Sequence, residues 1–350
     1  MACIICGKEE DVNEKGFCCT CAEKLEAFSD SSSVLHRLSQ QARQTSADMA
    51  APNEQTTDEP AARDGKTSQV LFQFGQSEEC SLRYPFSVAL GPAGQIMVLD
   101  QPEREQYRVT IYDPEGHYQG VFVRCARGEG PDQLKYPKGI AVDLHGNLYV
   151  PDAGNHRIQR FDAKGTCLGP IGSSGEGPGE FSFPCDVEID DIGSLYVADT
   201  YNDRIQKLTA KGISLLQIGD EQGELDGPLG VTVDRQGCIY IADTNHHRVV
   251  KYDADGQLHL TFGKEGMDCG EMTLPSDVRV SEDGTIYVAD QDNMRIQKFH
   301  SEGRFLAQFA LEAITGGDKT PEGDIAVDDD GHLIVCDKYA NKVIKAELYA

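Results

Sequence analysis

Residues 139–184 consist of four short apolar runs separated by turn residues. The runs are IAV, LYV, RIQRF and CLGPIG, and each break between them contains Gly, Asp or Asn. Runs of this length with such boundaries predict four antiparallel β-strands joined by tight turns. The middle of the stretch recurs as GSLYVADTYNDRIQKL, GCIYIADTNHHRVVKY, GTIYVADQDNMRIQKF and GHLIVCDKYANKVIKA, and GQIMVLD opens an imperfect first copy.

An aspartate closes the second apolar run of each copy and marks the period. It occurs at Asp100, Asp152, Asp199, Asp243, Asp290 and Asp337, at intervals of 52, 47, 44, 47 and 47 residues. Six four-stranded copies at a period of roughly 45 residues predict an all-β fold, a six-bladed β-propeller. The sixth copy lacks a fourth strand, and residues 70–75 (VLFQFG) match fourth strands such as LHLTFG. We therefore expect this N-terminal strand to close the last blade and remove two exposed sheet edges.

The pattern divides the 350 residues into three parts. Residues 70–350 form the propeller, residues 1–28 are rich in cysteine, and residues 29–69 are rich in Ser, Gln, Ala, Thr and Asp, which predicts a polar, disordered linker. No apolar run is long enough to span a membrane, and the first residues lack the basic and apolar segments of a secretory signal. A cytoplasmic protein is therefore expected.

The N-terminal cysteines form two CxxC pairs, Cys3 with Cys6 and Cys18 with Cys21. Two such pairs separated by eleven residues can place four thiolates around one Zn²⁺, and Cys19 is an alternative ligand to Cys18. A knuckle, a hairpin and a following helix resemble a zinc ribbon. The zinc is expected to be structural, because so small a unit cannot bury a sufficient core without it. The ligands are too few for the two zinc ions of a RING finger.

The repeated pattern resembles the NHL repeat. Pro-x-Gly-Ile-Ala-Val-Asp is followed by Gly-Asn-Leu-Tyr-Val-x-Asp and by Asn-His-Arg-Ile-Gln-Arg-Phe-Asp, in which the Asn-His pair is Asn155-His156. The resemblance covers residues 70–350 and implies a six-bladed propeller, in agreement with the count of copies. It also implies an interaction platform, although some relatives bind RNA through a basic face.

The closing aspartate and a base five residues later predict turn architecture. The bases are Arg157, Arg204, Arg248, Arg295 and Lys342. Catalytic sites depend on single, differently tuned groups, so a carboxylate that recurs in all six copies favours a structural role over a metal or acid–base site. The first strand of each copy carries small residues, which fits six strands crowding around an axis.

The net charge of −26 bears on the choice of partner. Residues 1–28 contribute −3 and residues 29–69 contribute −2, which leaves −21 on the propeller. This charge repels nucleic acid and anionic membranes, so neither is expected as a partner. It favours a protein or peptide, with a preference for basic ones.

Two groups of residues are candidates for partner contact. The long Gly-rich loops between copies carry acids, and an insertion of three residues makes the first copy irregular, which breaks the symmetry where a specific contact is expected. The loop candidates are Glu129, Asp132, Glu176, Glu180, Glu221, Glu224, Glu265 and Glu271. The candidates beside the insertion are Glu103, Arg104, Glu105 and Tyr107.

The favoured function is a non-enzymatic interaction or scaffold protein, with the zinc knuckle as a second docking module. The alternative is a metal-dependent propeller enzyme, a lyase or a lactonase-like hydrolase, with an axial site. The resemblance implies that such an enzyme carries non-repeating His, Asn, Asp or Glu residues at the ends of its inner strands. The histidines of this chain mostly occupy turn positions, and no HExxH motif or catalytic triad is present.

Overall fold

The computed structural model describes residues 68–77, 80–219, 224–316 and 324–349. All of them belong to one compact unit that spans residues 66–350. The predicted zinc unit, with Cys3, Cys6, Cys18 and Cys21, lies outside the described residues, as does the linker apart from Ser68 and Gln69. Among the described residues, no helix is long and apolar enough to cross a membrane.

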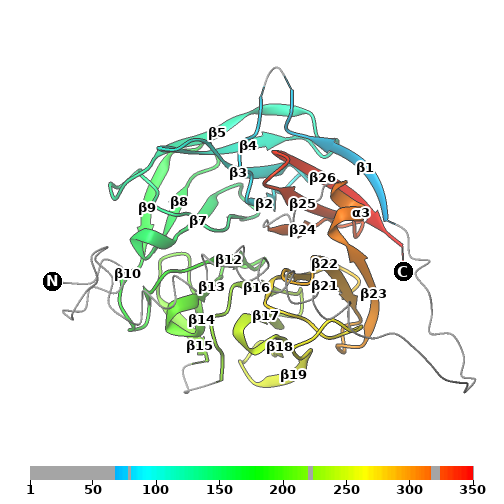
Figure 1. Ribbon diagram of the computed structural model, residues 1–350. Coiled ribbons are helices and arrows are strands. Elements are labelled where there is room, and N and C mark those ends of the chain that lie inside the picture. Colours follow the sequence, from blue (N-terminus) through cyan, green and yellow to red (C-terminus); the bar gives the residue numbers. More distant parts are fainter. Residues whose placement is uncertain (1–67, 78–79, 220–223, 317–323, 350) are drawn as a thin grey trace, which may run out of the picture. The chain divides into compact units, whose positions relative to one another are not determined.

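The propeller consists of six four-stranded antiparallel sheets, as predicted (Figure 1). Blade 1 contains β2 (Ser87–Leu90), β3 (Ile96–Glu103), β4 (Gln106–Tyr112) and β5 (Tyr118–Ala126); blade 2 contains β6 (Ala141–Val142), β7 (Leu148–Asp152), β8 (Arg157–Phe161) and β9 (Cys167–Ile171). Blade 3 contains β12 (Asp186–Ile189), β13 (Leu195–Asp199), β14 (Arg204–Leu208) and β15 (Ser214–Ile218); blade 4 contains β16 (Gly230–Val233), β17 (Ile239–Asp243), β18 (Arg248–Tyr252) and β19 (Leu258–Phe262). Blade 5 contains β20 (Pro275–Val280), β21 (Ile286–Asp290), β22 (Arg295–Phe299) and β23 (Phe305–Ala310); blade 6 contains β24 (Ile325–Val327), β25 (Leu333–Asp337), β26 (Lys342–Leu348) and β1 (Ser68–Phe74).

A few short elements lie between the blade strands. Strands β10 (Ser173–Ser174) and β11 (Glu180–Phe181) pair in parallel within the loop between blades 2 and 3, and helix α3 (Leu311–Thr315) follows blade 5. Three 3₁₀ turns lie between the second and third strands of blades 2, 3 and 4: η1 (Ala153–Asn155), η2 (Thr200–Asn202) and η3 (Thr244–His246).

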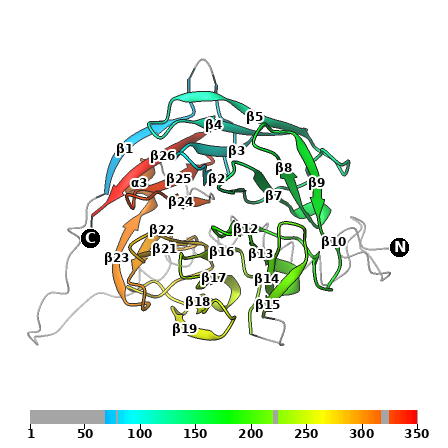
Figure 2. The same ribbon diagram turned by 180° about the vertical axis from the view of Figure 1, so that it is seen from behind.

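The inner strands close a ring around the axis. Each contacts its neighbours in blade order, from β2 through β6, β12, β16 and β20 to β24, which contacts β2 again. Figure 2 shows the same ring from behind, with β2, β12, β16 and β24 facing its centre.

The first strand of the chain completes the last blade. Strand β1 pairs antiparallel with β26, so the sheet order of blade 6 is β1-β26-β25-β24. Phe74 of β1 also packs on Tyr112 of blade 1, with ring centroids 4.4 Å apart. The predicted closure is therefore confirmed, and β1 joins the last blade to the first.

The second strand of each blade is apolar along its length, without the alternation of apolar and polar residues typical of a half-exposed strand. The five residues of β7, β13, β17, β21 and β25 are all buried. Such a strand packs on a neighbouring blade through both faces, so both of its faces are apolar. The core is accordingly divided into clusters between adjacent blades, such as the one that joins Tyr149 of blade 2 to Val197 of blade 3.

The blade connections lie on two opposite faces. One face carries the loops between blades and the turns between the second and third strands, and we call it the loop face. The other turns form the turn face. Backbone hydrogen bonds join the two kinds of loop on the loop face: Gly154 donates to the Lys135 carbonyl (2.8 Å) and Tyr201 to the Ser182 carbonyl (3.0 Å).

Candidate functional site

The repeated aspartates anchor the loops between blades. The buried Asp152 accepts hydrogen bonds from the Lys135 backbone (2.6 Å), from the Asn155 amide (2.7 Å) and from Arg157 Nε (2.7 Å). Arg157 also donates to the carbonyls of Gly130 and Gln133 (2.7 and 2.9 Å). Equivalent pairs are Asp100–Arg108, Asp199–Arg204, Asp243–Arg248 and Asp290–Arg295. In blade 6, Lys342 donates to Gln73 of β1 and to the Thr315 carbonyl. The pairs are turn architecture, as the sequence indicates.

Several acids of the Gly-rich loops also bind within the protein. Glu129 pairs with Lys135 (2.8 Å) and Glu271 with Lys264 (2.9 Å). Glu180 accepts the Gly177 amide (3.0 Å), and Glu224 accepts the Tyr252 hydroxyl (2.8 Å). Asp132, Glu176 and Glu265 are exposed on the loop face, and Glu221 lies outside the described residues. The loops therefore use much of their charge for their own architecture.

The insertion in blade 1 lengthens the β3–β4 hairpin. Asp100 pairs with Arg108 and Glu103 with Gln106, which leaves Arg104 and Glu105 at the tip with side chains 91 and 73% exposed. Tyr107 differs from the surface position expected for it, because it is buried against Phe86. Burial raises the pKa of its phenol. Tyr107 is therefore a core residue and cannot contact a partner directly.

In five of the junctions between blades, the residue before a proline has a left-handed backbone conformation. The φ angles of Tyr84, Tyr136, Phe183 and Leu274 lie between 48 and 54°, and Gly227 has φ 54°. Bulky side chains and a following proline both disfavour this conformation. An acceptor from the preceding blade stabilises it by binding the backbone amide of the strained residue: Asn341 binds Tyr84 (2.9 Å), His156 binds Phe183 (3.1 Å), Asp203 binds Gly227 (2.9 Å) and His247 binds Leu274 (3.0 Å). The conformation belongs to the repeat, but the identity of the side chain differs between blades.

Four aromatic side chains occupy the loop face in blades 6, 1, 2 and 3. We call them the aromatic crescent: Tyr339, Tyr84, Tyr136 and Phe183. Tyr84, Tyr136 and Tyr339 are 54, 48 and 41% exposed. Phe183 is half-buried and stacks on Tyr201 with ring centroids 4.8 Å apart. Tyr84, Tyr136 and Phe183 share their strained backbone conformation with Gly227 and Leu274, which hold the same position before blades 4 and 5. Aromatic side chains at this position are therefore confined to one side of the propeller.

A second group converges on the axis from blades 3, 5 and 6. Arg279 of β20 binds Asp277 on its own strand (2.9 Å), Asp186 of β12 (3.1 Å) and Asp324 beside β24 (3.1 Å). Its guanidinium also donates to the carbonyls of Val231 and Ile325. We call Asp186, Glu188, Asp277, Arg279 and Asp324 the axial cluster. The Arg279 guanidinium thus contacts carboxylates from blades 3, 5 and 6 and a backbone carbonyl of blade 4.

Small residues in the neighbouring blades provide room for these carboxylates. A Cβ atom on Gly139 would lie 2.9 Å from Asp186 Oδ1, and one on Gly230 would lie 2.9 Å from Asp277 Oδ1. In blade 1, the Ser87 hydroxyl donates to Asp324 (2.8 Å). The expectation of small inner-strand residues therefore needs correction: the position is small in blades 1, 2 and 4 and acidic in blades 3, 5 and 6.

Burial makes Asp186, Glu188 and Asp277 hard to ionise. It raises the pKa of Asp186 to about 6 and that of Glu188 to about 7, against the opposing effect of Arg279. The pKa of Asp277 is also raised, chiefly by burial. Asp186 and Glu188 are thus poised to take up protons near neutral pH.

Sequence reasoning missed both the axial cluster and the crescent. The sequence signal for the axial cluster is that the residue type differs between blades at positions a fixed distance from the closing aspartate. The position thirteen residues before that aspartate holds Ser87, Gly139, Asp186, Gly230, Asp277 and Asp324. The residue two positions later is Ala89, Ala141, Glu188, Thr232, Arg279 and Ala326.

A comparison with known protein families matches residues 134–161, 225–252 and 272–299 to the NHL repeat. These segments run from the anchor of a loop between blades to the third strand of blades 2, 4 and 5. The chain carries NHL repeats.

Solved structures show the same architecture as this NHL propeller at low identity. A streptogramin B lyase matches with a TM-score of 0.55 and 15% identity over 80% of this chain and 98% of that chain. A gluconolactonase from Xanthomonas campestris matches with 0.56 and 18% over 76 and 87%, and a chain of a nidogen–laminin complex with 0.53 and 18% over 66 and 81%. A search of curated proteins returned no match. At these identities the likeness establishes the fold alone.

The histidine of the NHL repeat has a structural role in this chain. His156 and His247 adopt positive φ at the end of the turn and accept a backbone amide of the next blade through Nδ1. Burial, followed by the charge of Lys135, lowers the pKa of His156, which favours the neutral ring that this hydrogen bond requires. These rings hold adjacent NHL blades together.

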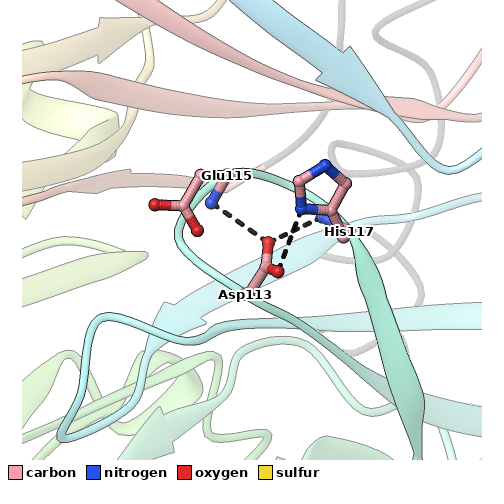
Figure 3. A group of neighbouring side chains, drawn as sticks. All are labelled: Asp113, Glu115 and His117. Atoms are coloured by element: carbon pink, nitrogen blue, oxygen red, sulfur yellow. Dashed lines mark hydrogen bonds and ion pairs between the residues drawn. The ribbon is translucent and has the colours of Figure 1, made fainter.

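Possible metal-ligand groups in the NHL propeller lie on the turn face. Figure 3 shows Asp113, whose carboxylate binds the backbone amides of Glu115 (3.1 Å) and His117 (2.8 Å) and the His117 ring (3.0 Å). Asp328, Asp330 and His332 form an equivalent group. Aspartates at the corresponding turns of other blades bind backbone amides in the same way, for example Asp143 and Asp253. The groups are therefore explained as turns closed by an aspartate side chain.

Proposed function

We propose that this chain is a non-enzymatic binding protein whose NHL propeller holds a protein or peptide partner on its loop face. The aromatic crescent is the observation that carries the proposal. Its three tyrosines are 41–54% exposed on neighbouring blades, and aromatic residues are enriched at the cores of protein interfaces. Tyr84 and Tyr136 have left-handed backbone, and Asn341 of the preceding blade binds the Tyr84 amide. This presents the rings in a fixed orientation at little entropic cost on binding.

The axial cluster favours binding over metal-dependent catalysis as the function. Arg279 already occupies the position among Asp186, Asp277 and Asp324 where their negative charges converge. In the part of the chain that the structure describes, the groups of three ligands with atoms within 4.8 Å of one another lie on the turn face, not at the axis. An arginine that is buried and saturated by carboxylates and carbonyls stabilises a scaffold rather than a reaction centre.

Paired substitutions on the crescent test this function. Tyr84→Asn with Tyr136→Asn removes both rings, and asparagine tolerates the left-handed backbone, so the fold should persist. We expect immobilised full-length protein to lose its partner in affinity capture followed by mass spectrometry, with its melting curve little changed.

The matched control is Leu168→Thr with Leu258→Thr, which removes exposed apolar side chains from the outer strands β9 and β19. This control should recover the same proteins as the natural sequence. Equal recovery by the crescent variant and the control would place the docking surface elsewhere.

We further propose that residues 1–28 form a second docking unit around one structural zinc. The support is the spacing of Cys3, Cys6, Cys18 and Cys21. Metal analysis of the full chain should find one zinc per molecule, lost in Cys3→Ser and in Cys18→Ser. Cys269→Ser, at an exposed thiol between blades 4 and 5, is the control and should keep its zinc. Full zinc in Cys3→Ser would contradict the site, and Cys19→Ser distinguishes the alternative ligand.

A further inference from the structure

We propose that the aromatic crescent binds an extended, acidic peptide segment of the partner. This inference rests on the proposed function of the loop face and specifies the chemistry of its ligand. It runs against the preference for basic partners that the net charge predicts, because the local distribution of charge on the loop face differs from the total.

A basic side chain accompanies each ring of the crescent. Arg127 lies over the Tyr136 ring at 4.7 Å and donates to its hydroxyl (2.6 Å). Lys138 lies 5.8 Å from the Phe183 ring and Lys338 5.4 Å from the Tyr339 ring. Arg83 directly precedes Tyr84. An aromatic face with an adjacent cation can pack against an apolar side chain and pair with a neighbouring carboxylate.

Three of these bases differ from the other arginines of the loop face in having no internal carboxylate partner. Within the described residues, Arg83, Arg127 and Lys138 form no ion pair. Their side chains contact the Pro102 carbonyl, the Tyr136 hydroxyl and the Phe183 ring, respectively. By contrast, the arginines of the repeat are paired with the closing aspartates. In a chain with 58 acids and 32 bases, three cations that pair with no carboxylate of the described residues lie beside exposed rings and form a complementary surface for a ligand's acids.

The acids near the crescent do not cancel this surface. Lys135 neutralises Glu129, and Arg104 lies 3.9 Å from Glu105 at the hairpin tip. A nucleic acid carries a negative charge at every phosphate along its length. The net charge of −21 on the propeller therefore repels a nucleic acid more strongly than a short acidic peptide. We therefore favour a peptide, although exposed aromatics and bases are also used to bind single-stranded nucleic acid.

Fluorescence anisotropy of the full-length protein tests the inference with three labelled probes. One peptide alternates Glu with Phe, the second alternates Lys with Phe, and the third probe is single-stranded poly-U RNA. We expect the acidic peptide to bind most tightly and to weaken as salt is raised. Arg127→Gln with Lys138→Gln should raise its Kd at least tenfold, while Lys211→Gln, at an exposed lysine of the turn face, should leave it unchanged.

Each contrary result has a distinct meaning. Tighter binding of the Lys peptide or of RNA overturns the inference. So does an acidic peptide that binds weakly, or whose Kd is the same in the Arg127→Gln, Lys138→Gln variant. If the Lys peptide binds and Tyr84→Asn with Tyr136→Asn abolishes that binding, the loop face remains a docking surface and only the acidic chemistry fails. If no crescent substitution alters any binding or capture, the proposed function fails as well.

Discussion

Replacing Arg279 with alanine is expected to lower the melting temperature of the propeller by roughly 10 °C at neutral to alkaline pH. The substitution leaves Asp186, Asp277 and Asp324 buried around an empty position, without the cation that binds all three. Removing one partner of a buried ion pair typically costs about 3–5 kcal/mol. Thermal unfolding followed by circular dichroism measures the effect. Arg235→Ala, which breaks an exposed pair with Glu282, is the control and should cost less than about 1 kcal/mol.

The loss should depend on pH in a defined direction. Burial raises the pKa of Asp186 to about 6 and that of Glu188 to about 7 in the folded protein, above the values near 4 of unfolded chains. Protonation therefore favours the folded state: this contribution to stability is complete below the unfolded pKa and is lost as pH rises through 6–7. The Arg279→Ala variant should accordingly recover part of its stability at about pH 5, because its carboxyls can be protonated.

Glu188→Gln separates this electrostatic effect from loss of packing. It retains the shape of the side chain and removes the charge, so it should raise the free energy of unfolding by about 1–2 kcal/mol at pH 8 and change it little at pH 5. A Glu188→Gln variant with the same stability as the natural protein at both pH values would show that the axial carboxyls are well solvated. An Arg279→Ala deficit independent of pH would have the same meaning.

The fold could be predicted from the sequence because the same pattern of apolar strands and turn residues repeats along the chain. An apolar second strand ending in aspartate requires two neighbouring blades, and six such strands require a closed ring. The same repetition explains why the aspartate and the base after it could be recognised as architecture. The Asp152–Arg157 contact, with its hydrogen bonds to Lys135 and Gly130, has a counterpart in four other blades and holds a loop between blades in place.

The candidate site could not be predicted in the same way, because it consists of departures from the repeat. Asp186 stands where Gly139 and Gly230 stand in other blades, and its importance depends on Arg279, 93 residues away. Net charge does not distinguish acids that close loops from acids that face solvent, so it could not locate the bases beside the crescent. Tyr107 shows the limit of choosing residues by their place in an insertion: the tip of the hairpin is exposed, but the pleat of β4 turns Tyr107 into the core.

Deleting residues 70–75 is expected to have the largest effect on stability. The deletion removes most of β1, whose backbone pairs with β26 along blade 6. It also removes Phe72 and Phe74, which pack in the cluster that joins blades 6 and 1 through Tyr112. The expected loss is at least about 5 kcal/mol, comparable with the whole stability of a marginal domain, so much of the protein should be unfolded at 37 °C. Val70→Thr with Leu71→Thr, which changes exposed side chains and keeps the strand, should stay within about 1 kcal/mol.

The deletion also tests closure as a specific pairing rather than as simple loss of apolar surface. Without β1, the edge of β26 exposes unpaired backbone groups, which are a template for another strand. A synthetic peptide of residues 68–77 should therefore bind the shortened protein and raise its melting temperature, because it can pair with β26 and return both phenylalanines to the junction. A peptide of the same composition in scrambled order should not. An unchanged melting curve in the deletion variant, or equal rescue by both peptides, would mean that the ring does not depend on this strand to close.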